Sequence, residues 1–276
     1  MSSFEKYDET SRHYDATRQA VGSEIILGCL ARHEKPLGEL RVLDAGCGTG
    51  AYSAALVARV GRIEALDLSQ GMLAQARAKL ADQEKAGRIG FHQGAITELP
   101  FEDEDFDAVT INQVIHHLGD AGENFARLRQ VMGEVARVLR PGGMLVLNHC
   151  SQEQLRDAYW YYRLAPRAHD RVRRNFAPIE TLRSIWTEAS LAARGAFVPL
   201  DAVCQGAAYF DGRGPLDKVW RDGDSFWALV EPEELDTAQA QVRALDEAGE
   251  LDAFVTEHDA RRPSIGQITF LCAVRG

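Results

Sequence analysis

Short apolar stretches alternate with helical stretches between residues 40 and 150, and this alternation constrains the fold more than any other feature of the chain. The apolar segments with the composition of buried strands are RVLDAG, RIEALDLS, IGFHQGA, DFDAVTINQ and MLVLNHC. Strands that alternate with helices form a parallel sheet whose two faces are covered by those helices. The pattern therefore predicts an α/β fold with a doubly wound, mostly parallel sheet.

Helical periodicity predicts the elements that separate these strands. Ahead of the first strand, SEIILGCLARH has apolar residues at helical spacing, and Ser23 is the expected N-cap. Further helices are expected at AYSAALVARV, at GMLAQARAKLADQEKAG as a single helix, and at FARLRQVMGEVARVL. The sequence RPGG at 140–143 predicts a turn before the fifth strand.

The alternation ends near residue 151, and the rest of the chain predicts a lid on the same sheet. Residues 151–195 have a mostly helical pattern, and two further strands are expected at GAFVPLDAV and QITFLCAV, with an insertion at about 205–265 between them. We therefore expect a seven-stranded Rossmann-like sheet with helical lid insertions, in one structural domain. Its expected parts are a helical cap (1–39), a cofactor-binding core (40–150) and a segment that completes the sheet and adds the lid (151–276).

Composition and charge argue against several classes of partner. The chain of 276 residues has a net charge of −10 and a pI of about 5.3, whereas binding to a nucleic-acid backbone needs clustered positive charge. No apolar run approaches the ~20 residues of a membrane span, and the polar N-terminus is unlike a signal peptide. Five scattered cysteines without CxxC spacing indicate reduced thiols rather than disulfides or a zinc site. We expect a cytoplasmic monomer or homodimer without a bound metal.

The glycine-rich stretch VLDAGCGTG spans the end of the first predicted strand and the loop after it, and it indicates a ligand site. Gly46, Gly48 and Gly50 allow a tight turn and a close approach of the backbone to a ligand. In a doubly wound sheet, ligands bind beyond the carboxyl ends of the strands, which is where this loop is expected. The glycines alone leave the ligand open, because their spacing also fits the dinucleotide fingerprint if Ala51 replaces the last glycine.

Two acidic residues distinguish between these ligands. Asp44 lies in the strand just before the glycines, where a carboxylate is unfavourable for a pyrophosphate but suits an ammonium group. Asp67 ends the second strand, where a carboxylate accepts hydrogen bonds from ribose hydroxyls. An amino acid joined to an adenosine satisfies both positions. S-adenosylmethionine, whose sulfonium cation lies between those two ends, is therefore the expected cofactor.

Several segments resemble the motifs of one known family, in its order and at its spacing. VLDAGCGTG, ALDLSQGML, LPFEDEDFDAV, INQVIHHL and VLRPGGML are similar to motifs of the class I S-adenosylmethionine-dependent methyltransferases. Within that superfamily they most resemble the small-molecule group typified by ubiquinone/menaquinone-type methyltransferases. The resemblance covers about residues 40–150, and the opening YDETSRHYDATR also resembles the Tyr-Asp repeat that begins many of these enzymes.

The resemblance implies a set of cofactor contacts. Around the methionine end it implies Asp44, Gly46, Cys47, Gly48, Asn112 and Gln113; on the ribose, Asp67; and around the adenine, Leu68, Met72, Ala95 and Ile96. Two of these residues also have a simpler explanation, Met72 as a core residue and Cys47 as a small residue with a backbone role. One departure from the family is Gly94, where many relatives carry an acid that reaches the adenine amino group.

Methyl transfer requires the acceptor atom, the methyl group and the sulfur to be aligned, and a general base only if the acceptor must lose a proton. The candidate bases are His116 and His117, expected on the first turn of the helix after the fourth strand, and His149 at the end of the fifth. His116 is preferred to His117, because adjacent helical residues point about 100° apart and one of them faces the site. Packing and capping explain the histidine pair equally well.

The acceptor pocket is expected to come from the parts outside the shared core. Aromatic residues gather there in DAYWYYRLAP, AAYFDG and DSFWAL and favour a small apolar or aromatic molecule. The residues expected to contact the acceptor are Tyr14, Trp160, Tyr161 and Tyr209, although aromatic residues are most often core residues. Cys150 and Cys204 also suggest a soft acceptor such as trivalent arsenic, held by thiols.

The sequence thus favours an S-adenosylmethionine-dependent methyltransferase that acts on a small, apolar or aromatic molecule by in-line methyl transfer. One alternative is a nicotinamide-dependent Rossmann oxidoreductase, against which Asp44 and LRPGG argue. The other is a protein that binds S-adenosylmethionine without catalysis, because a degenerate acceptor site has much the same sequence.

Overall fold

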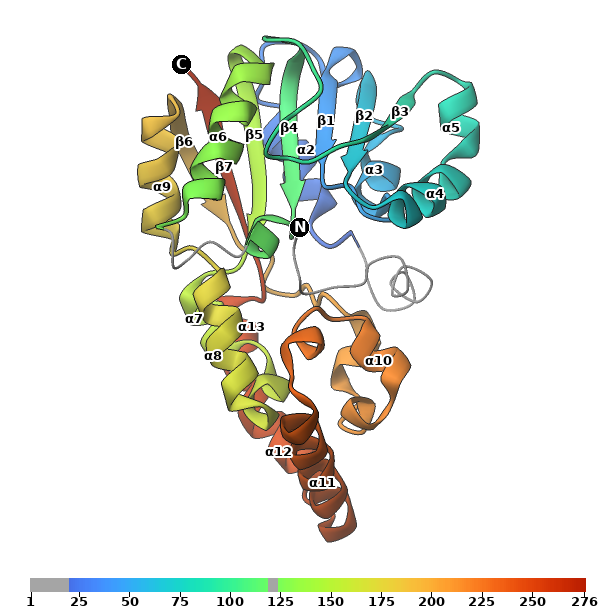
Figure 1. Ribbon diagram of the computed structural model, residues 1–276, viewed down its shortest axis with the longest axis vertical. Helices are drawn as coiled ribbons and strands as arrows, with labels where there is room; N and C mark the ends of the chain where they lie inside the picture. The colour runs from blue at the N-terminus through green and yellow to red at the C-terminus, as the bar shows by residue number, and fades with distance from the viewer. Residues whose placement is uncertain (1–19, 119–123) are drawn as a thin grey trace.

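The computed structural model describes residues 20–118 and 124–276, and its centre is a seven-stranded sheet (Figure 1). The strand order is β3-β2-β1-β4-β5-β7-β6. The strands are β1 (Arg41–Ala45), β2 (Arg62–Asp67), β3 (Ile89–Gln93), β4 (Phe106–Asn112), β5 (Leu139–His149), β6 (Leu191–Phe197) and β7 (Thr269–Arg275). β7 runs antiparallel to both of its neighbours, and the other pairs are parallel. The predicted fold class, a mostly parallel Rossmann-like sheet of seven strands, is confirmed.

Helices cover both faces of the sheet, as the strand sequences require. Successive strand residues point to opposite faces, and in β1 Val42 joins one buried hydrophobic cluster while Leu43 joins the other. The first cluster includes residues of α2 (Ser23–Leu30), α3 (Ala51–Leu56) and α4 (Gln70–Lys79), and the second includes residues of α6 (Ala126–Val138) and α9 (Ile179–Glu188). The buried residues of α6 recur at the spacing of an amphipathic helix and are Leu128, Val131, Met132, Val135 and Val138.

The boundaries of α2 and α4 differ from the prediction. Ser23 is the first residue of α2, and its N-cap is Gly22, which has a φ of 75° and makes no side-chain hydrogen bond. The single helix predicted at 71–87 is broken into α4 and α5 (Ala81–Lys85), because Leu80 leaves the helical conformation with φ −116° and ψ 25°. Leu80 is buried at this break, so core packing takes precedence over the continuous helical pattern.

The boundaries of β5 and β6 also differ. RPGG lies inside β5, which begins at Leu139, and is not a turn ahead of the strand; the β4–β5 register shifts at this point. The sixth strand is predicted at 195–203 but ends at Phe197, before Pro199, because proline has no N–H for the ladder. It begins earlier than predicted, at Leu191, which pairs with Arg275 of β7.

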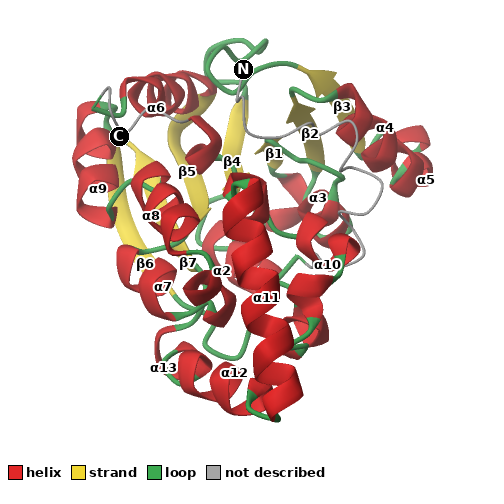
Figure 2. Cartoon of the chain, turned by 60° about the horizontal axis from the view of Figure 1, so that its bottom comes forward, coloured by secondary structure: helices red, strands yellow, loops and turns green. Residues whose placement is uncertain are grey.

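The segments that follow β5 and that lie between β6 and β7 form a helical lid below the sheet in Figure 1. The mostly helical character predicted for residues 151–195 is confirmed. The lid elements of the first segment are α7 (Gln152–Asp157), η4 (Trp160–Leu164) and α8 (Pro166–Asn175). Those of the second are η5 (Gly206–Phe210), η6 (Gly214–Leu216), α10 (Lys218–Asp222), η7 (Trp227–Leu229), α11 (Pro232–Ala248), α12 (Leu251–Asp259) and α13 (Arg262–Ile265). Figure 2 shows the lid from below, with α11 in front.

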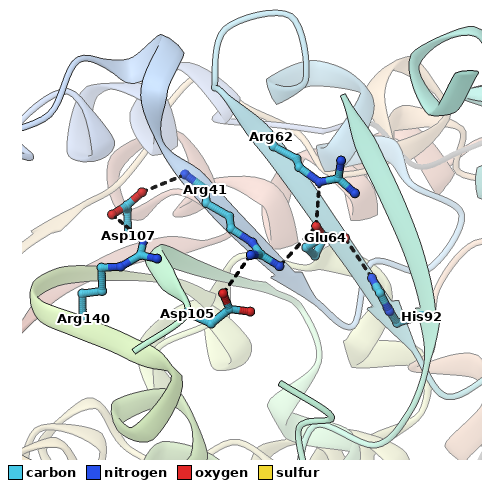
Figure 3. Close-up of polar contacts among 7 residues, drawn as sticks. All are labelled: Arg41, Arg62, Glu64, His92, Asp105, Asp107 and Arg140. Carbon is cyan, nitrogen blue, oxygen red and sulfur yellow. Dashed lines mark hydrogen bonds and ion pairs between the residues drawn. The ribbon is translucent and has the colours of Figure 1, made fainter. Parts of the chain in front are cut away.

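Ion pairs form a network among side chains of the first strands (Figure 3), near the strand starts at the end of the sheet away from the lid (Figure 1). The buried Glu64 carboxylate of β2 accepts a hydrogen bond from Arg62 Nε at 2.7 Å and lies 2.8 Å from His92 Nε2 and 3.4 Å from an Arg41 guanidinium nitrogen. Burial acts to raise the pKa of Glu64, but the hydrogen bonds from Arg62 and His92 outweigh it, and the pKa lies below its ordinary value. Gly90 makes room for this carboxylate, since a Cβ there would lie 2.3 Å from Glu64 Oε2. The network joins the first three strands.

Candidate active site

The glycine loop between β1 and α3 lies beside the point where the strand order reverses, between β1 and β4. Gly46 has a φ of 81°, and a Cβ on it would lie 2.5 Å from Val114 Cγ2. Gly50 has a φ of 78°, and a Cβ on it would lie 3.0 Å from Ala76 Cβ. Gly48, with a φ of 54°, is different, because a Cβ there would meet nothing within 4 Å. Packing thus requires Gly46 and Gly50, whereas Gly48 faces open space.

Asp67 ties the glycine loop to the start of α4. One carboxylate oxygen accepts a hydrogen bond from the Gly48 backbone N–H at 2.8 Å, and the other accepts one from the Ser69 N–H at 2.9 Å. Burial raises the pKa of Asp67, and these backbone hydrogen bonds only partly oppose the shift. A carboxylate has about four acceptor positions, so the two oxygens retain the capacity to accept further hydrogen bonds from a ligand hydroxyl.

Asp44 is an inward-facing acid beneath the same loop. It is 1% exposed, and its carboxylate accepts hydrogen bonds from Ser53 Oγ at 2.6 Å and Thr110 Oγ1 at 3.3 Å. Burial raises its pKa against these hydrogen bonds, and the nearby charge of Asp67 raises it further. A positive group placed beside Asp44 favours its ionised form, so the site is suited to an ammonium group.

The end of β4 supplies two amides. Asn112 is 8% exposed, and its amide lies close enough to Asp44 to lower the pKa of that carboxyl, but among the described residues neither amide atom makes a hydrogen bond of ordinary geometry. Buried side-chain amides in native proteins are generally hydrogen-bonded, so Asn112 indicates a place for a polar ligand group. Gln113 has a φ of 56°, and its Nε2 donates to Asn148 Oδ1 at 2.8 Å. Asn148 Nδ2 in turn donates to the Tyr52 hydroxyl at 2.9 Å, so a partly buried chain of hydrogen bonds fixes the Gln113 side chain.

The residues predicted around the adenine differ in exposure. Leu68 follows β2 and is 54% exposed, an apolar surface available to a ligand ring, whereas Met72 is buried. Ala95 and Ile96 follow β3 and are partly exposed. The departure at Gly94 has a structural reason, since a Cβ there would lie 3.2 Å from Leu66 Cδ1 and 3.5 Å from a proline ring carbon. Neighbouring side chains therefore leave little room for the acid that many relatives carry.

The sequence predicts the paired histidines on the first turn of the helix that follows β4. In the structure they lie instead on the short 3-10 helix η2 (Ile115–Leu118). His116 is buried, and its ring stacks on Phe176 of the lid with centroids 4.4 Å apart and an interplanar angle of 10°. The centroid of the His117 ring lies 3.9 Å from that of His116, and His117 is more exposed than His116. The structure thus brings His116 to the junction of β4 and the lid.

His149 is held as a neutral side chain. Its Nε2 lies 2.8 Å from the Ala177 carbonyl oxygen, and because a carbonyl only accepts, this nitrogen carries the hydrogen. Burial lowers the pKa of His149 to about 4. The ring is therefore neutral at pH 7 but a weak base there, since general bases work best with a pKa near the operating pH.

The predicted acceptor residues of the lid are packed against one another. Trp160, Tyr161 and Tyr209 are fully buried, and Tyr161 and Tyr209 form edge-to-face contacts with centroids 6.1 Å apart. Their polar atoms are paired within the lid: Trp160 Nε1 donates to the Tyr209 carbonyl at 2.8 Å, and the Tyr209 hydroxyl donates to Asp259 at 2.6 Å. These contacts favour a role in the lid core. Tyr14 lies outside the described residues.

Cys150, which follows the last residue of β5, contacts the segment that leads into the lid. Its sulfur lies 3.6 Å from the Tyr159 hydroxyl and 3.9 Å from Gln113 Nε2. Burial, and secondarily the nearby Cys204, raise the pKa of Cys150 to about 12, so the thiol is protonated at pH 7. A protonated thiol is a poor ligand for a soft acceptor such as trivalent arsenic.

Tyr159, Asn148 and Tyr52 join the contacts around the candidate site, and sequence reasoning missed them. Asn148 and Tyr52 are 96 residues apart, and no local pattern indicates their contact.

Within the described ranges, no group of three or more histidine, cysteine or acidic side chains is arranged to hold a metal ion. No helix in this part of the chain has both the length and the apolar character that crossing a membrane requires.

Residues 43–147 match the family described as a methyltransferase domain. The demethylmenaquinone methyltransferase of Clavibacter sepedonicus is 37% identical over 144 residues, which are 51% of this chain and 55% of that protein. The demethylmenaquinone methyltransferase of Lactiplantibacillus plantarum is 38% identical over 114 residues, which are 40% of this chain and 45% of that protein. The chain therefore spans about half the length of the curated relatives it matches.

Solved structures share the fold over most of the chain. A putative methyltransferase from an antibiotic biosynthesis pathway of Anabaena variabilis has a TM-score of 0.69 at 21% identity and covers 90% of this chain and 96% of its own. Geranyl diphosphate C-methyltransferase from Streptomyces coelicolor, in complex with Mg²⁺, geranyl diphosphate and S-adenosyl-L-homocysteine, has a TM-score of 0.54 at 14% identity and covers 92% of this chain and 78% of its own. At these identities the likeness shows the fold alone.

Proposed function

We propose that this chain, whose residues 43–147 match a methyltransferase domain, is a class I S-adenosylmethionine-dependent methyltransferase that transfers a methyl group from S-adenosylmethionine to a small, apolar or aromatic molecule. The observation that carries the proposal is the arrangement around the glycine loop. Asp67 lies against the loop from β2, the buried amide of Asn112 ends β4, and Gly48 faces open space. A sulfonium nucleoside offers ribose hydroxyls to the first and an amino-acid group to the second.

The side chains present fit each end of this cofactor. Asp67 retains acceptor capacity for ribose hydroxyls after its two backbone hydrogen bonds. Asn112 takes the methionine end, together with Asp44, whose pKa its side chain lowers. The residues for the methionine end also include Gly46, Cys47, Gly48 and Gln113, and those for the adenine are Leu68, Met72, Ala95 and Ile96. When bound, S-adenosylmethionine supplies a methyl group that its positive sulfur has already activated.

The contribution of the chain itself is orientation and the exclusion of water. Gln113 is fixed by Asn148 at the end of β4, and the lid follows directly from the neighbouring end of β5. Orientation of reacting groups contributes roughly 7–11 kcal/mol to such reactions. For an acceptor that loses a proton, His116 is the best placed base, because it joins β4 to the lid whereas His149 is a weak base at pH 7.

The nature of the acceptor rests on the lid. The methyltransferase domain match ends at residue 147, before the lid begins, and the curated relatives are named for demethylmenaquinone. The lid is rich in aromatic residues, and although most of them pack in its core, this composition supports an apolar or aromatic acceptor. The net charge of −10 supports a protein that acts without a nucleic-acid partner, and we infer a cytoplasmic monomer or homodimer.

Thermal stability in the presence of S-adenosylhomocysteine tests the cofactor assignment. A ligand at a hundredfold excess over its Kd stabilises the folded state by about 2.7 kcal/mol, which corresponds to roughly 5–10 °C in the Tm of a chain of this size. Asp67→Ala is expected to lose most of this increase, because the ribose hydroxyls lose their acceptor. Asp82→Ala is the matched control, because Asp82 is a highly exposed acid on α5.

The outcomes are distinct. An increase in the Tm of the wild type and of Asp82→Ala but not of Asp67→Ala supports the proposal. No increase in the wild type, or an equal increase in Asp67→Ala, contradicts it. Transfer itself is measured by mass spectrometry, as S-adenosylhomocysteine formed together with an acceptor that is heavier by one methylene unit.

A further inference from the structure

Gln205, in the lid segment between β6 and η5, has a buried side-chain amide. It is 4% exposed, and in the described part of the chain neither its amide nitrogen nor its amide oxygen has a hydrogen-bond partner. A buried polar group without a partner costs free energy, and most such groups in native proteins are paired with protein, water or ligand. Gln205 therefore indicates a partner that is not part of the described chain.

The residue before Gln205 is anchored to the lid at a defined place. The Cys204 backbone N–H donates to Gln267 Oε1 at 2.7 Å. The Gln267 carbonyl in turn accepts a hydrogen bond from the Tyr159 hydroxyl at 3.0 Å. Two hydrogen bonds thus connect the backbone beside Gln205 to Tyr159.

Tyr159 leads from this place to the end of the sheet where methyl transfer is proposed. Its hydroxyl lies 3.6 Å from Cys150 Sγ, at the end of β5. Cys150 Sγ lies 3.9 Å from Gln113 Nε2, at the end of β4. The Gln205 segment is therefore joined by direct contacts to the residues beside the proposed methionine end of the cofactor.

The same part of the lid is aromatic. The rings of Tyr159 and Tyr162 stack with centroids 4.7 Å apart, and those of Tyr162 and Phe226 stack with centroids 4.1 Å apart. Planar apolar molecules pack well against such stacked rings. A primary amide presents one acceptor oxygen and a donor nitrogen side by side, and it pairs best with a ligand edge that carries a donor next to an acceptor.

We propose that Gln205 is a specificity-determining residue of the methyl-acceptor site and binds a planar, apolar molecule through an edge that carries a hydrogen-bond donor beside an acceptor, as two adjacent hydroxyls do. The proposal rests on the proposed methyltransferase function, because it assigns the acceptor of that same site. Gln205 lies outside the matched methyltransferase domain of residues 43–147, in the part of the chain that is free to set acceptor choice.

The test compares two probes by isothermal titration calorimetry, with the protein saturated with S-adenosylhomocysteine. The probes are 2,3-dihydroxynaphthalene, which has the paired edge, and 2-naphthol, which has one hydroxyl. The wild type is expected to bind the diol about three- to tenfold more tightly, the effect of one additional hydrogen bond. Gln205→Leu, which keeps a similar volume and removes both polar atoms, is expected to bind the two probes equally.

Two controls separate specificity from folding. Gln239→Leu changes the same type of side chain on α11, where Gln239 donates to the Pro215 carbonyl, and it should retain the preference for the diol. Gln205→Leu should melt at the wild-type temperature or above, because it removes two unpaired buried atoms. Gln205→Met serves as a second variant if the leucine variant does not fold.

Several results overturn the proposal. These are no preference for the diol in the wild type, no binding of either probe, a preference retained in Gln205→Leu or Gln205→Met, or a Tm several degrees lower in both variants, which identifies Gln205 as a structural residue. If S-adenosylhomocysteine stabilises the wild type in these experiments, only the acceptor assignment fails. If S-adenosylhomocysteine does not stabilise the wild type, the proposed methyltransferase function itself is contradicted, and the acceptor assignment falls with it.

Discussion

Gly48→Ala separates ligand binding from folding in the glycine loop. Gly48 has a φ of 54°, a left-handed conformation that alanine adopts at a cost of roughly 1–2 kcal/mol. No clash adds to this cost, since a Cβ there would meet nothing within 4 Å. The backbone hydrogen bond from Gly48 to Asp67 is also retained. The variant is therefore expected to fold, with a Tm lower by roughly 2–8 °C.

The added methyl group occupies the space that we assign to the cofactor. We therefore expect Gly48→Ala to bind S-adenosylhomocysteine at least tenfold more weakly by calorimetry, which corresponds to about 1.4 kcal/mol. Gly46→Ala is the matched comparison, because its Cβ would lie 2.5 Å from Val114 Cγ2 and its φ is 81°, so it should lose more stability than Gly48→Ala. If Gly48→Ala folds and binds with wild-type affinity, the loop does not contact the cofactor at this position and the reasoning is refuted.

Two further predictions concern ionisable groups. The pKa of His149, lowered by burial to about 4 in the folded protein, is about 6.5 in the unfolded chain, so stability should fall as the pH drops from about 6.5 towards 4, by ~3 kcal/mol at most. In urea unfolding near pH 7 and near pH 5, His149→Gln should show a smaller loss than the wild type, and an equal loss contradicts a neutral buried His149. Glu64→Gln removes the charge that holds Arg62 and His92 (Figure 3) and should cost about 1–2 kcal/mol, since these partners are partly exposed. Its affinity for S-adenosylhomocysteine should be unchanged, and a weaker affinity means that the network acts on the site.

Local periodicity was sufficient for the order and type of the main elements. The continuous apolar run of β1 indicates a strand that is covered on both faces, and the spacing of the buried residues in α6 indicates which side of that helix faces the core. The ends of the elements were harder to predict, because they depend on tertiary contacts. The break at Leu80 follows burial of that side chain, and the earlier start of β6 follows its pairing with β7.

The candidate site was predictable only where the backbone itself is specialised. Gly46 and Gly50 have positive φ and no room for a side chain, so the presence of glycine at these positions is enough to predict the turn. The fixing of Gln113 by Asn148 and Tyr52 joins residues that are far apart in the chain, and no local pattern contains it. For the aromatic residues of the lid, composition predicted a pocket, but several of these side chains are fully buried against one another. Composition does not reveal this burial, because it depends on tertiary packing.

A crystal structure with bound S-adenosylhomocysteine tests the central claim most directly. The account predicts that the ribose hydroxyls lie within hydrogen-bonding distance of Asp67, that the amino-acid end meets the Asn112 amide beside Asp44, and that the nucleoside covers Gly48. A nucleoside bound at another place, or one bound at the loop with Asp67 and Asn112 turned away from it, contradicts the account.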